Sequence, residues 1–161
     1  MKKLSAYMLV LVMALSFAGC GSEKKSKNLE GSMTDLLNQI YETADLEQDF
    51  RDVLEFYETT EITSENAGQL IGTDEVSFEE GVYSAPMNTS IAYQLVLLRL
   101  KDGEDVNAAM EVIEKNANPR KWVCVEAESV IVNHVGDVIL FVMAEKIDAD
   151  ALNTAFTNLA K

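Results

Sequence analysis

The sequence predicts an α+β domain, in which a mainly antiparallel sheet of about four strands has helices packed on one face. The clearest evidence is a pair of apolar, β-branched runs at 129–135 and 137–144, joined only at Gly136. Such a short connection leaves no room for a crossover, so the two runs are expected to form an antiparallel hairpin. Other segments repeat apolar residues every three or four positions, which is typical of amphipathic helices. Because no internal repeat or second boundary occurs, residues 32–161 are expected to form a single domain.

The first half of this domain is expected to be mainly helical. Apolar residues at helical spacing predict a helix over 33–41, with Ser32 or Thr34 as its cap. The next segment, 50–62, begins with the same spacing but continues with β-branched and aromatic residues, so helix and irregular strand both remain open. A short capped helix is expected over 64–70.

The second half is expected to alternate strands and helices. A strand is expected over 76–84, and the almost continuous apolar run at 91–100 predicts a central strand buried on both faces. A helix is expected over 106–117, and a last helix, capped by Asp148, follows the hairpin. The resulting β-α-β-β-α order fits part of a ferredoxin-like arrangement, although it does not fix the order of the strands in the sheet.

The chain begins with a segment that has the parts of a secretory signal peptide. Lys2 and Lys3 precede an apolar stretch of about 14 residues, and small residues follow it. The stretch is short for a transmembrane helix, which needs about 20 apolar residues. Residues 1–19 are therefore expected to direct export.

Two cleavage sites compete at the end of this segment. Phe17, Ala18, Gly19 and Cys20 resemble the lipobox of bacterial lipoproteins, in which the cysteine becomes the first mature residue and carries a diacylglyceryl group. Phe17 stands where leucine is usual, but a lone cysteine directly after Ala-Gly favours this interpretation. The alternative is ordinary cleavage after Ala18, which would release a soluble protein. We expect lipid on Cys20 and a location on the outer face of the cell membrane.

The stretch after the cysteine is expected to be a flexible tether. Residues 21–31 read GSEKKSKNLEG and have no apolar repeat that would let them fold. A random coil of this length reaches roughly 20 Å. Lys24, Lys25 and Lys27 would either contact anionic headgroups, at about 1 kcal/mol each, or only keep the tether soluble.

The chain is strongly acidic, with 13 Lys and Arg against 27 Asp and Glu and a formal charge of −14. Without the signal peptide and the tether, the domain holds 8 basic and 25 acidic residues, which gives −17. Fourteen of these acids lie between Asp35 and Glu80, where Arg51 is the one basic residue. This charge argues against a nucleic-acid partner, because phosphates are recognised by basic surfaces. An anionic membrane would repel the domain, so retention there is expected to depend on the lipid.

Six short segments stand out between Leu36 and the end of the chain. They are TEIT at 60–63, ENA at 65–67, APM at 85–87, SIA at 90–92, NPRKW at 118–122 and VEAE at 125–128. In these segments the chain resembles a family of bacterial lipoproteins known only as a domain of unknown function. The resemblance implies a lipid-anchored, extracytoplasmic protein, and it brings no catalytic residues.

Arg120, Lys121 and Trp122 form a compact basic and aromatic cluster. Because Trp and Arg dominate the energetics of many interfaces, the cluster is a candidate binding site. The alternative, which we favour, places the indole in the core while the two charges offset the dipole of the preceding helix.

Glu126 and Glu128 alternate along the expected start of a strand and are a candidate pair of carboxylates for acid–base chemistry. Such a pair would have to share a cleft that raises the pKa of one carboxyl. Two separately solvated carboxylates are the simpler interpretation.

Few other residues suggest chemistry. Cys124 is expected to be a buried structural residue, and His134 is expected to pack beside the hairpin turn. The acids at 102–105 and 45–49 lack the glycine placement of a calcium-binding loop. No phosphate-binding loop, nucleophile elbow or zinc motif occurs, so neither a metal nor a cofactor is expected.

These features favour a non-catalytic binding or accessory module that is anchored to the membrane through Cys20 and recognises a protein or a small ligand. The alternative is an extracytoplasmic hydrolase in which Glu126 and Glu128 act as acid and base.

Overall fold

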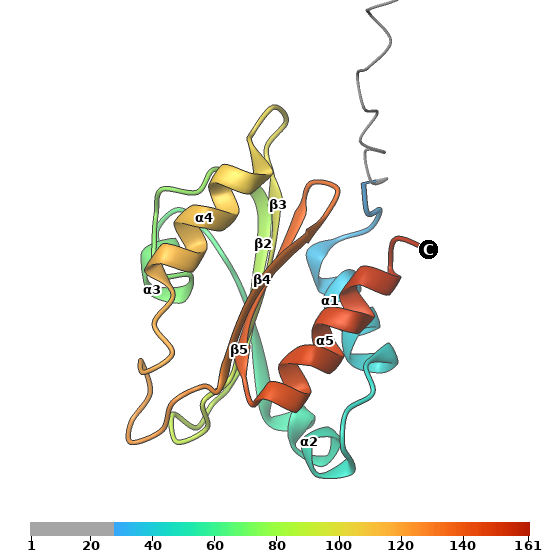
Figure 1. Ribbon diagram of the computed structural model, residues 1–161, viewed down its shortest axis with the longest axis vertical. Coiled ribbons are helices and arrows are strands. Elements are labelled where there is room, and N and C mark those ends of the chain that lie inside the picture. Colours follow the sequence, from blue (N-terminus) through green and yellow to red (C-terminus); the bar gives the residue numbers. More distant parts are fainter. Residues whose placement is uncertain (1–27) are drawn as a thin grey trace, which may run out of the picture.

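One antiparallel sheet of five strands, covered by helices on both faces, makes up residues 28–161, the part of the chain that the computed structural model describes (Figure 1). The signal peptide, Cys20 and the first part of the tether lie outside these residues. The helices are α1 (Met33–Thr43), α2 (Gln48–Val53), the single-turn η1 (Leu54–Phe56), α3 (Ala67–Leu70), α4 (Val106–Asn116) and α5 (Lys146–Asn158). The strands are β1 (Tyr57–Glu61), β2 (Phe78–Pro86), β3 (Gln94–Leu100), β4 (Ser129–Val135) and β5 (Val138–Ala144).

The strands lie in the order β1-β2-β3-β5-β4, and every neighbouring pair is antiparallel. β3 and β4 therefore run in the same direction, with β5 inserted between them and α4 as the crossover. This split β-α-β unit is part of the expected ferredoxin-like arrangement. The fold then departs from that arrangement, because α5 packs on the opposite face of the sheet from α4.

The expectation that the helices cover one face of the sheet is wrong. α1, α2 and α5 cover one face, and α3 and α4 cover the other (Figure 1). The cause lies in the central strands β3 and β5, which bury side chains on both sides of the sheet. In β3, Leu95 and Leu97 enter the first core while Val96 and Leu98 enter the second, following the period of two of a strand. A sheet with two apolar faces needs a helical layer on each.

The α+β class is confirmed, and the hairpin of β4 and β5 forms as expected. The additional strand comes from the segment left open, because residues 50–62 divide among α2, η1 and the edge strand β1. The expected strand over 91–100 is shorter, since β3 begins at Gln94. Across residues 28–161, no helix combines the length and the apolarity needed to cross a membrane.

The helix starts differ from the expectation in one respect that matters for the site. Ser32 caps α1 as expected, with its hydroxyl oxygen accepting from the backbone N–H of Asp35 at 3.1 Å. Asp148 does not cap α5, because the helix begins at Lys146 directly after Glu145. Asp148 instead lies in the first turn, with its carboxyl on the side of the sheet that α5 covers.

Residues 28–31, expected to belong to the flexible tether, are held against the domain. Leu29 is buried in the core beside α1. The Arg99 guanidinium donates to the carbonyl oxygens of Leu29 at 3.0 Å and Gly31 at 2.9 Å, and it pairs with the Glu80 carboxylate at 3.1 Å. We call this arrangement the N-terminal clamp. The packed domain therefore begins before the expected boundary.

The tight turn between β4 and β5 lies at the same end of the sheet. Gly136 in this turn has a φ of +60°, and a Cβ atom there would lie 2.8 Å from the Cα of Asn28. No side chain fits between them without movement of the backbone. The turn and the clamp together fix the point where the chain enters the domain, at the upper end of the molecule in Figure 1.

Candidate functional site

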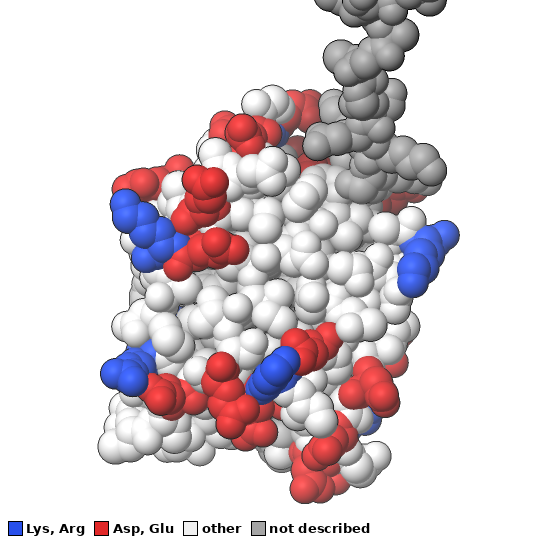
Figure 2. Space-filling view, in the orientation of Figure 1, with Lys and Arg blue, Asp and Glu red and all other residues white. Residues whose placement is uncertain are grey.

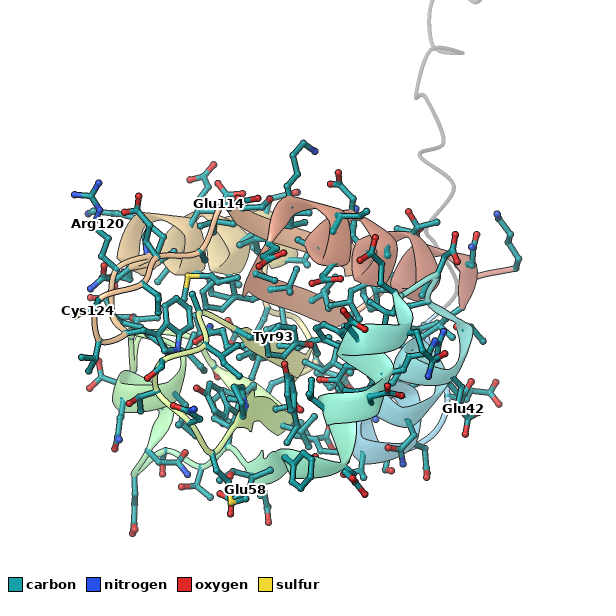
Figure 3. The ribbon with its side chains drawn as sticks, turned by 90° about the horizontal axis from the view of Figure 1, so that it is seen from below. Glu42, Glu58, Tyr93, Glu114, Arg120 and Cys124 are labelled. Atoms are coloured by element: carbon teal, nitrogen blue, oxygen red, sulfur yellow. The ribbon has the colours of Figure 1, made fainter. Side chains whose placement is uncertain are left out.

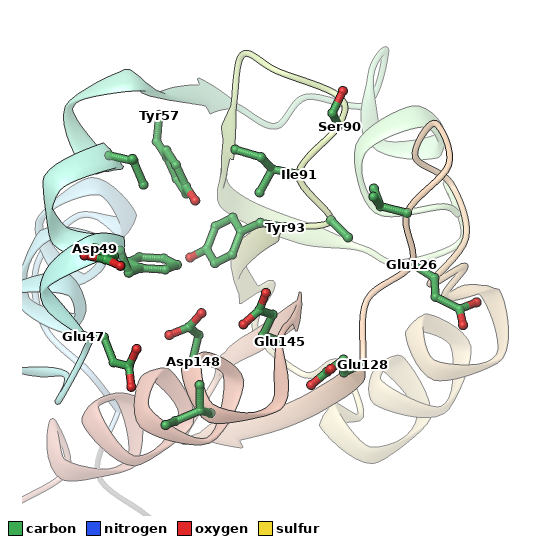
Figure 4. Close-up of a pocket in the computed structure, with 15 residues that line it drawn as sticks. Glu47, Asp49, Tyr57, Ser90, Ile91, Tyr93, Glu126, Glu128, Glu145 and Asp148 are labelled. Atoms are coloured by element: carbon green, nitrogen blue, oxygen red, sulfur yellow. The ribbon is translucent and has the colours of Figure 1, made fainter.

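A cleft of about 500 Å³ opens at the end of the sheet opposite the N-terminal clamp (Figure 4). Four segments far apart in the sequence meet there, because β3 begins and β5 ends at this edge of the sheet. They are α2 with the start of β1, the loop before β3, the loop before β4 and the first turn of α5. The lining residues are Glu47, Asp49, Phe50, Val53, Tyr57, Ser90, Ile91, Ala92, Tyr93, Val125, Glu126, Glu128, Glu145, Ile147 and Asp148.

Phe50, Tyr57 and Tyr93 form an aromatic cluster in this cleft. The ring centroid of Phe50 lies 5.3 Å from that of Tyr93 and 5.6 Å from that of Tyr57, and the two tyrosine rings lie 5.0 Å apart. The rings meet edge to face or tilted, which is the geometry that aromatic quadrupoles favour. Figure 3 shows Tyr93 near the centre of the molecule when it is seen from below.

Hydrogen bonds hold Tyr93 from the core side. Its hydroxyl lies 2.9 Å from that of Tyr41, which donates to the hydroxyl oxygen of Ser84 at 2.8 Å. Burial raises the pKa of Tyr41 and of Tyr57 to about 12, and it raises the pKa of Tyr93 well above its ordinary value. The hydroxyls therefore stay protonated at neutral pH, and the rings of the aromatic cluster carry no charge.

Six carboxylates line the cleft together with the aromatic cluster. They are Glu47, Asp49, Glu126, Glu128, Glu145 and Asp148. Among the described residues that line the cleft there is no Lys, Arg or His. Burial, with the neighbouring carboxylates of Glu145 and Glu47, raises the pKa of Asp148 above its ordinary value. Figure 2 shows acidic side chains, with a few basic ones among them, at the lower end of the molecule, and further acidic side chains at its upper left, with a largely uncharged middle between them.

Apolar side chains of the cleft are open to solvent. Ile147 is 57% exposed, Ile91 is 39% exposed, and Val53 and Val125 are each 36% exposed. Contiguous exposed apolar surface marks sites where a ligand or partner binds. Apolar walls with a few polar groups at the rim are also the usual form of a small-ligand site.

The candidate carboxylates Glu126 and Glu128 both line the cleft, but each has a separate partner. Glu126 accepts from the guanidinium of Arg120 at 2.5 Å, and both of these side chains are largely exposed. Glu128 accepts the backbone N–H of Lys146 at 3.2 Å. Figure 4 shows the Glu126 carboxylate turned away from Glu128 and from the middle of the cleft. In this arrangement the two carboxylates do not face each other.

The residues of the basic and aromatic cluster point to different places, and none of them lines the cleft. Arg120 is exposed at the edge of the molecule (Figure 3). Trp122 is partly buried against the second core, which is the packing that our favoured alternative describes. The Lys121 ammonium lies 5.2 Å from the ring centroid of Tyr83 and 5.5 Å from that of Trp122, and it donates to the side-chain oxygen of Gln94. Burial lowers the pKa of Lys121 to about 8.

Cys124 is exposed, so the expectation of a buried cysteine is wrong. Its φ of +63° turns the chain outward in the loop before β4, and its neighbour Val123 is 63% exposed. A free cysteine is usually a core residue, but Cys124 and the valines on either side of it lie on a surface loop. His134 lies beside the hairpin turn as expected, with Nδ1 3.2 Å from the carbonyl oxygen of Gly136.

Residues 28–161 contain no group of His, Cys, Asp or Glu that is arranged to hold a metal ion. The alternating acids at 45–49, considered above for calcium, instead contribute Glu47 and Asp49 to the rim of the cleft. The carboxylates of the cleft are thus spread around the aromatic cluster and do not converge on one point.

Sequence reasoning missed the aromatic cluster and the acids of α5 as site residues. Tyr93 directly precedes an aliphatic strand, and Glu145 and Asp148 flank the start of the last helix. These positions are weak signals, since an aromatic residue or an acid at the start of an element is common. The fold brings them together: the pairing of β3 with β5 places Tyr93 beside the start of α5, and Phe50 and Tyr57 pack against Tyr93.

Comparisons with known proteins give no indication of function. No protein-family model matches the chain, no curated protein matches it, and no solved structure matches it. The resemblance to bacterial lipoproteins of unknown function therefore stays a prediction.

Proposed function

We propose that this chain is a lipid-anchored, extracytoplasmic binding module that holds a ligand in the cleft and performs no reaction on it. The observation that carries the proposal is the cleft itself, in which exposed apolar side chains and an aromatic cluster lie within a rim of polar groups. Its volume of about 500 Å³ is within the range of roughly 300 to 1,000 Å³ of small-molecule sites.

The chemistry of the lining supports binding over catalysis. Ser90 is the one serine among the described lining residues, and no histidine or lysine lines the cleft beside it to act as a base. The alternative, a hydrolase acting through Glu126 and Glu128, gains no support from the separate partners of these two carboxylates. It stays a prediction of the sequence.

The place where the chain enters the domain also supports the proposal. The N-terminal clamp and the cleft lie at opposite ends of β5, which has seven residues and spans about 20 Å at roughly 3.3 Å per residue. A lipid on Cys20 would attach the clamp end to the membrane. The cleft would then open away from the bilayer, where a ligand outside the cell can reach it.

Mass spectrometry of the mature chain tests the anchor. We expect an N-terminal Cys20 carrying lipid, and we expect Cys20→Ala to abolish membrane retention. An unmodified N-terminus at Gly19, or Cys20 without lipid, would overturn the anchor and leave a soluble binding module.

Photocrosslinking in intact cells tests the cleft. A photoreactive phenylalanine analogue replaces Ile147, which is 57% exposed inside the cleft, or Phe56, which is 55% exposed outside it. We expect an added mass on the chain labelled at 147 and none on the chain labelled at 56. Equal labelling, or none at either position, would contradict a ligand in the cleft.

A further inference from the structure

We propose that the ligand of this cleft is a small organic cation, an ammonium group carried on an apolar or aromatic body. This inference rests on the proposed function, since it names the class of ligand that the same cleft would take. The charge, the aromatic surface and the apolar wall of the cleft each favour such a ligand.

The charge of the cleft selects a cation. Its described lining holds six carboxyl groups and no basic side chain. Glu126, at the edge of the cleft, already pairs with Arg120, so the charge that a ligand would meet comes from the other carboxyl groups. Within this rim, the neighbours that Asp148 meets are the like charges of Glu145 and Glu47. A bound ammonium would replace this repulsion with attraction, whereas an anion would add to it.

The aromatic cluster selects an organic cation. Ring faces attract ammonium groups within about 6 Å of the ring centroid, and the attraction is larger where water is excluded. Phe50 and Tyr57 are half-buried and present uncharged rings in the cleft, and the buried Tyr93 packs against both of them. A cation in the cleft would therefore meet aromatic rings as well as carboxylates. The exposed Ile91 and Ile147 would cover the apolar body of the ligand.

A metal ion and a second copy of this chain fit less well. A metal ion needs several oxygen ligands converging at about 2 to 2.6 Å, and the described residues provide no such group. A second copy would bring another domain with a formal charge of −17 against the acidic rim. A small ammonium compound satisfies the rim, the rings and the volume together.

Three matched probes test the inference. They are phenethylamine, 2-phenylethanol and 3-phenylpropionate, which share a phenyl ring on a short chain and carry a positive, no or a negative charge. Titration calorimetry uses the full mature chain in phosphatidylcholine nanodiscs, with empty nanodiscs as the control. We expect phenethylamine to bind at least tenfold more tightly than the alcohol, and the carboxylate to bind most weakly.

The outcomes separate this inference from the proposed function. If 2-phenylethanol binds as tightly as phenethylamine, the cleft is a binding site, but the proposal that its ligand is a cation is overturned. If no probe binds while the chain labelled at 147 still gains mass in cells, the organic cation is overturned and the binding module stands. If a lysine-rich peptide binds and phenethylamine does not, the occupant is a protein and the small-molecule assignment is overturned.

Charge variants locate the binding site. Glu145→Gln combined with Asp148→Asn should weaken phenethylamine binding about tenfold or more. Glu111→Gln combined with Glu114→Gln removes two exposed acids from α4, outside the cleft, and should leave the affinity within about twofold. An equal loss in both double variants would show attraction to overall charge and would overturn the site.

An aromatic variant tests the rings. Phe50→Leu should weaken phenethylamine binding about threefold to tenfold and change 2-phenylethanol binding less, because only the amine gains the cation–π attraction. Phe56→Leu, outside the cleft, should change neither affinity. Circular dichroism of both variants verifies the fold. An equal loss for the amine and the alcohol in Phe50→Leu would overturn the aromatic part of the inference.

Discussion

The two ends of the sheet differ in whether their carboxylates have positively charged or hydrogen-bonding partners. At the clamp end, the Glu80 carboxylate pairs with Arg99 at 3.1 Å and accepts the backbone N–H of Met33 at 2.8 Å. At the cleft end, Asp148 lies beside the carboxylates of Glu145 and Glu47. One end of the domain satisfies its charges internally, and the other leaves negative charges beside exposed apolar side chains. Such unfavourable features are retained where they serve binding, at some expense of stability.

Backbone conformation shows the same contrast. Gly136 at the clamp end has a φ of +60°, and Cys124 in the loop at the cleft end has a φ of +63°. Glycine adopts this left-handed conformation without a steric penalty, whereas a residue with a Cβ atom does not. Among residues 28–161, the one residue other than glycine with a positive φ therefore lies at the cleft end, and strained residues of this kind cluster at functional sites.

Removing the centre of the clamp should give the largest effect. Arg99→Met leaves the Glu80 carboxylate without its cation and leaves the carbonyl oxygens of Leu29 and Gly31 without their donor. We expect the free energy of unfolding to fall by about 2 to 4 kcal/mol, because partly buried charged and polar groups lose their partners. Urea unfolding followed by circular dichroism measures the change.

Lys101→Met is the control for this variant, since it removes one positive charge from an exposed position close to Arg99 in sequence. Its stability should stay within about 0.5 kcal/mol of the wild type. If Arg99→Met loses no more stability than Lys101→Met, the clamp does not hold the domain.

The next largest effect is expected at the β4–β5 turn. Gly136→Ala places a Cβ atom 2.8 Å from the Cα of Asn28, in addition to the cost of a positive φ. Gly103→Ala has the positive φ but no atom within 4 Å of the new Cβ. We expect Gly103→Ala to lose about 1 kcal/mol and Gly136→Ala to lose about 1 to 2 kcal/mol more. Equal losses would show that Asn28 moves aside freely.

Sequence patterns predicted the elements whose signals are local. The hairpin of β4 and β5 was predictable from two strand-like runs around Gly136, and α4 from its period and the proline at 119. The arrangement of the helices on the two faces of the sheet was not predictable. The face on which α5 packs depends on the conformation of one residue, Glu145, which connects β5 to α5. No periodicity within either element records that direction.

The candidate site was less predictable for the same reason. Glu126 and Glu128 were noticed because they lie close together in sequence, and they line the cleft only at its edge. Phe50, Tyr93 and Asp148 lie far apart in sequence. The pairing of β3 with β5 brings Tyr93 to the start of α5, and the packing of α2 on the sheet brings Phe50 to Tyr93. Neither contact has a local signal in the sequence. Chemistry distributed over several elements is visible only once the fold is known.

Relieving the backbone at Cys124 should give a small gain. Cys124→Gly removes the Cβ atom from a residue at a φ of +63°. We expect a gain of about 0.5 kcal/mol, because the relief of steric strain is partly offset by the greater freedom of glycine in the unfolded chain. Urea unfolding measures it, with Val123→Gly as the control at the neighbouring exposed position. A loss of stability in Cys124→Gly would show that the loop is not strained.

The smallest effect tests the unfavourable charge directly. Asp148→Asn removes a carboxyl that like charges and burial disfavour, so we expect stability at pH 7 to rise by a few tenths of a kcal/mol. Asp150→Asn on the same helix removes the partner of Lys146, an ion pair at 2.5 Å, and should be neutral or slightly destabilising. Thermal unfolding of the two variants should thus shift in different directions, by about 1 °C.

The effect of Asp148→Asn on stability should depend on pH. The pKa of Asp148 is higher in the folded chain than its ordinary value of 3.8, so the folded state holds the proton over the interval between the two values. The contribution of this carboxyl to stability therefore falls as pH rises through that interval. The advantage of Asp148→Asn should be complete above the raised pKa and absent below pH 3.8. If Asp148→Asn is still more stable than the wild type at pH 3, the gain comes from the packing of the amide and not from the loss of a charge. Asp148 would then not be one of the unfavourable charges that distinguish the cleft end from the clamp end.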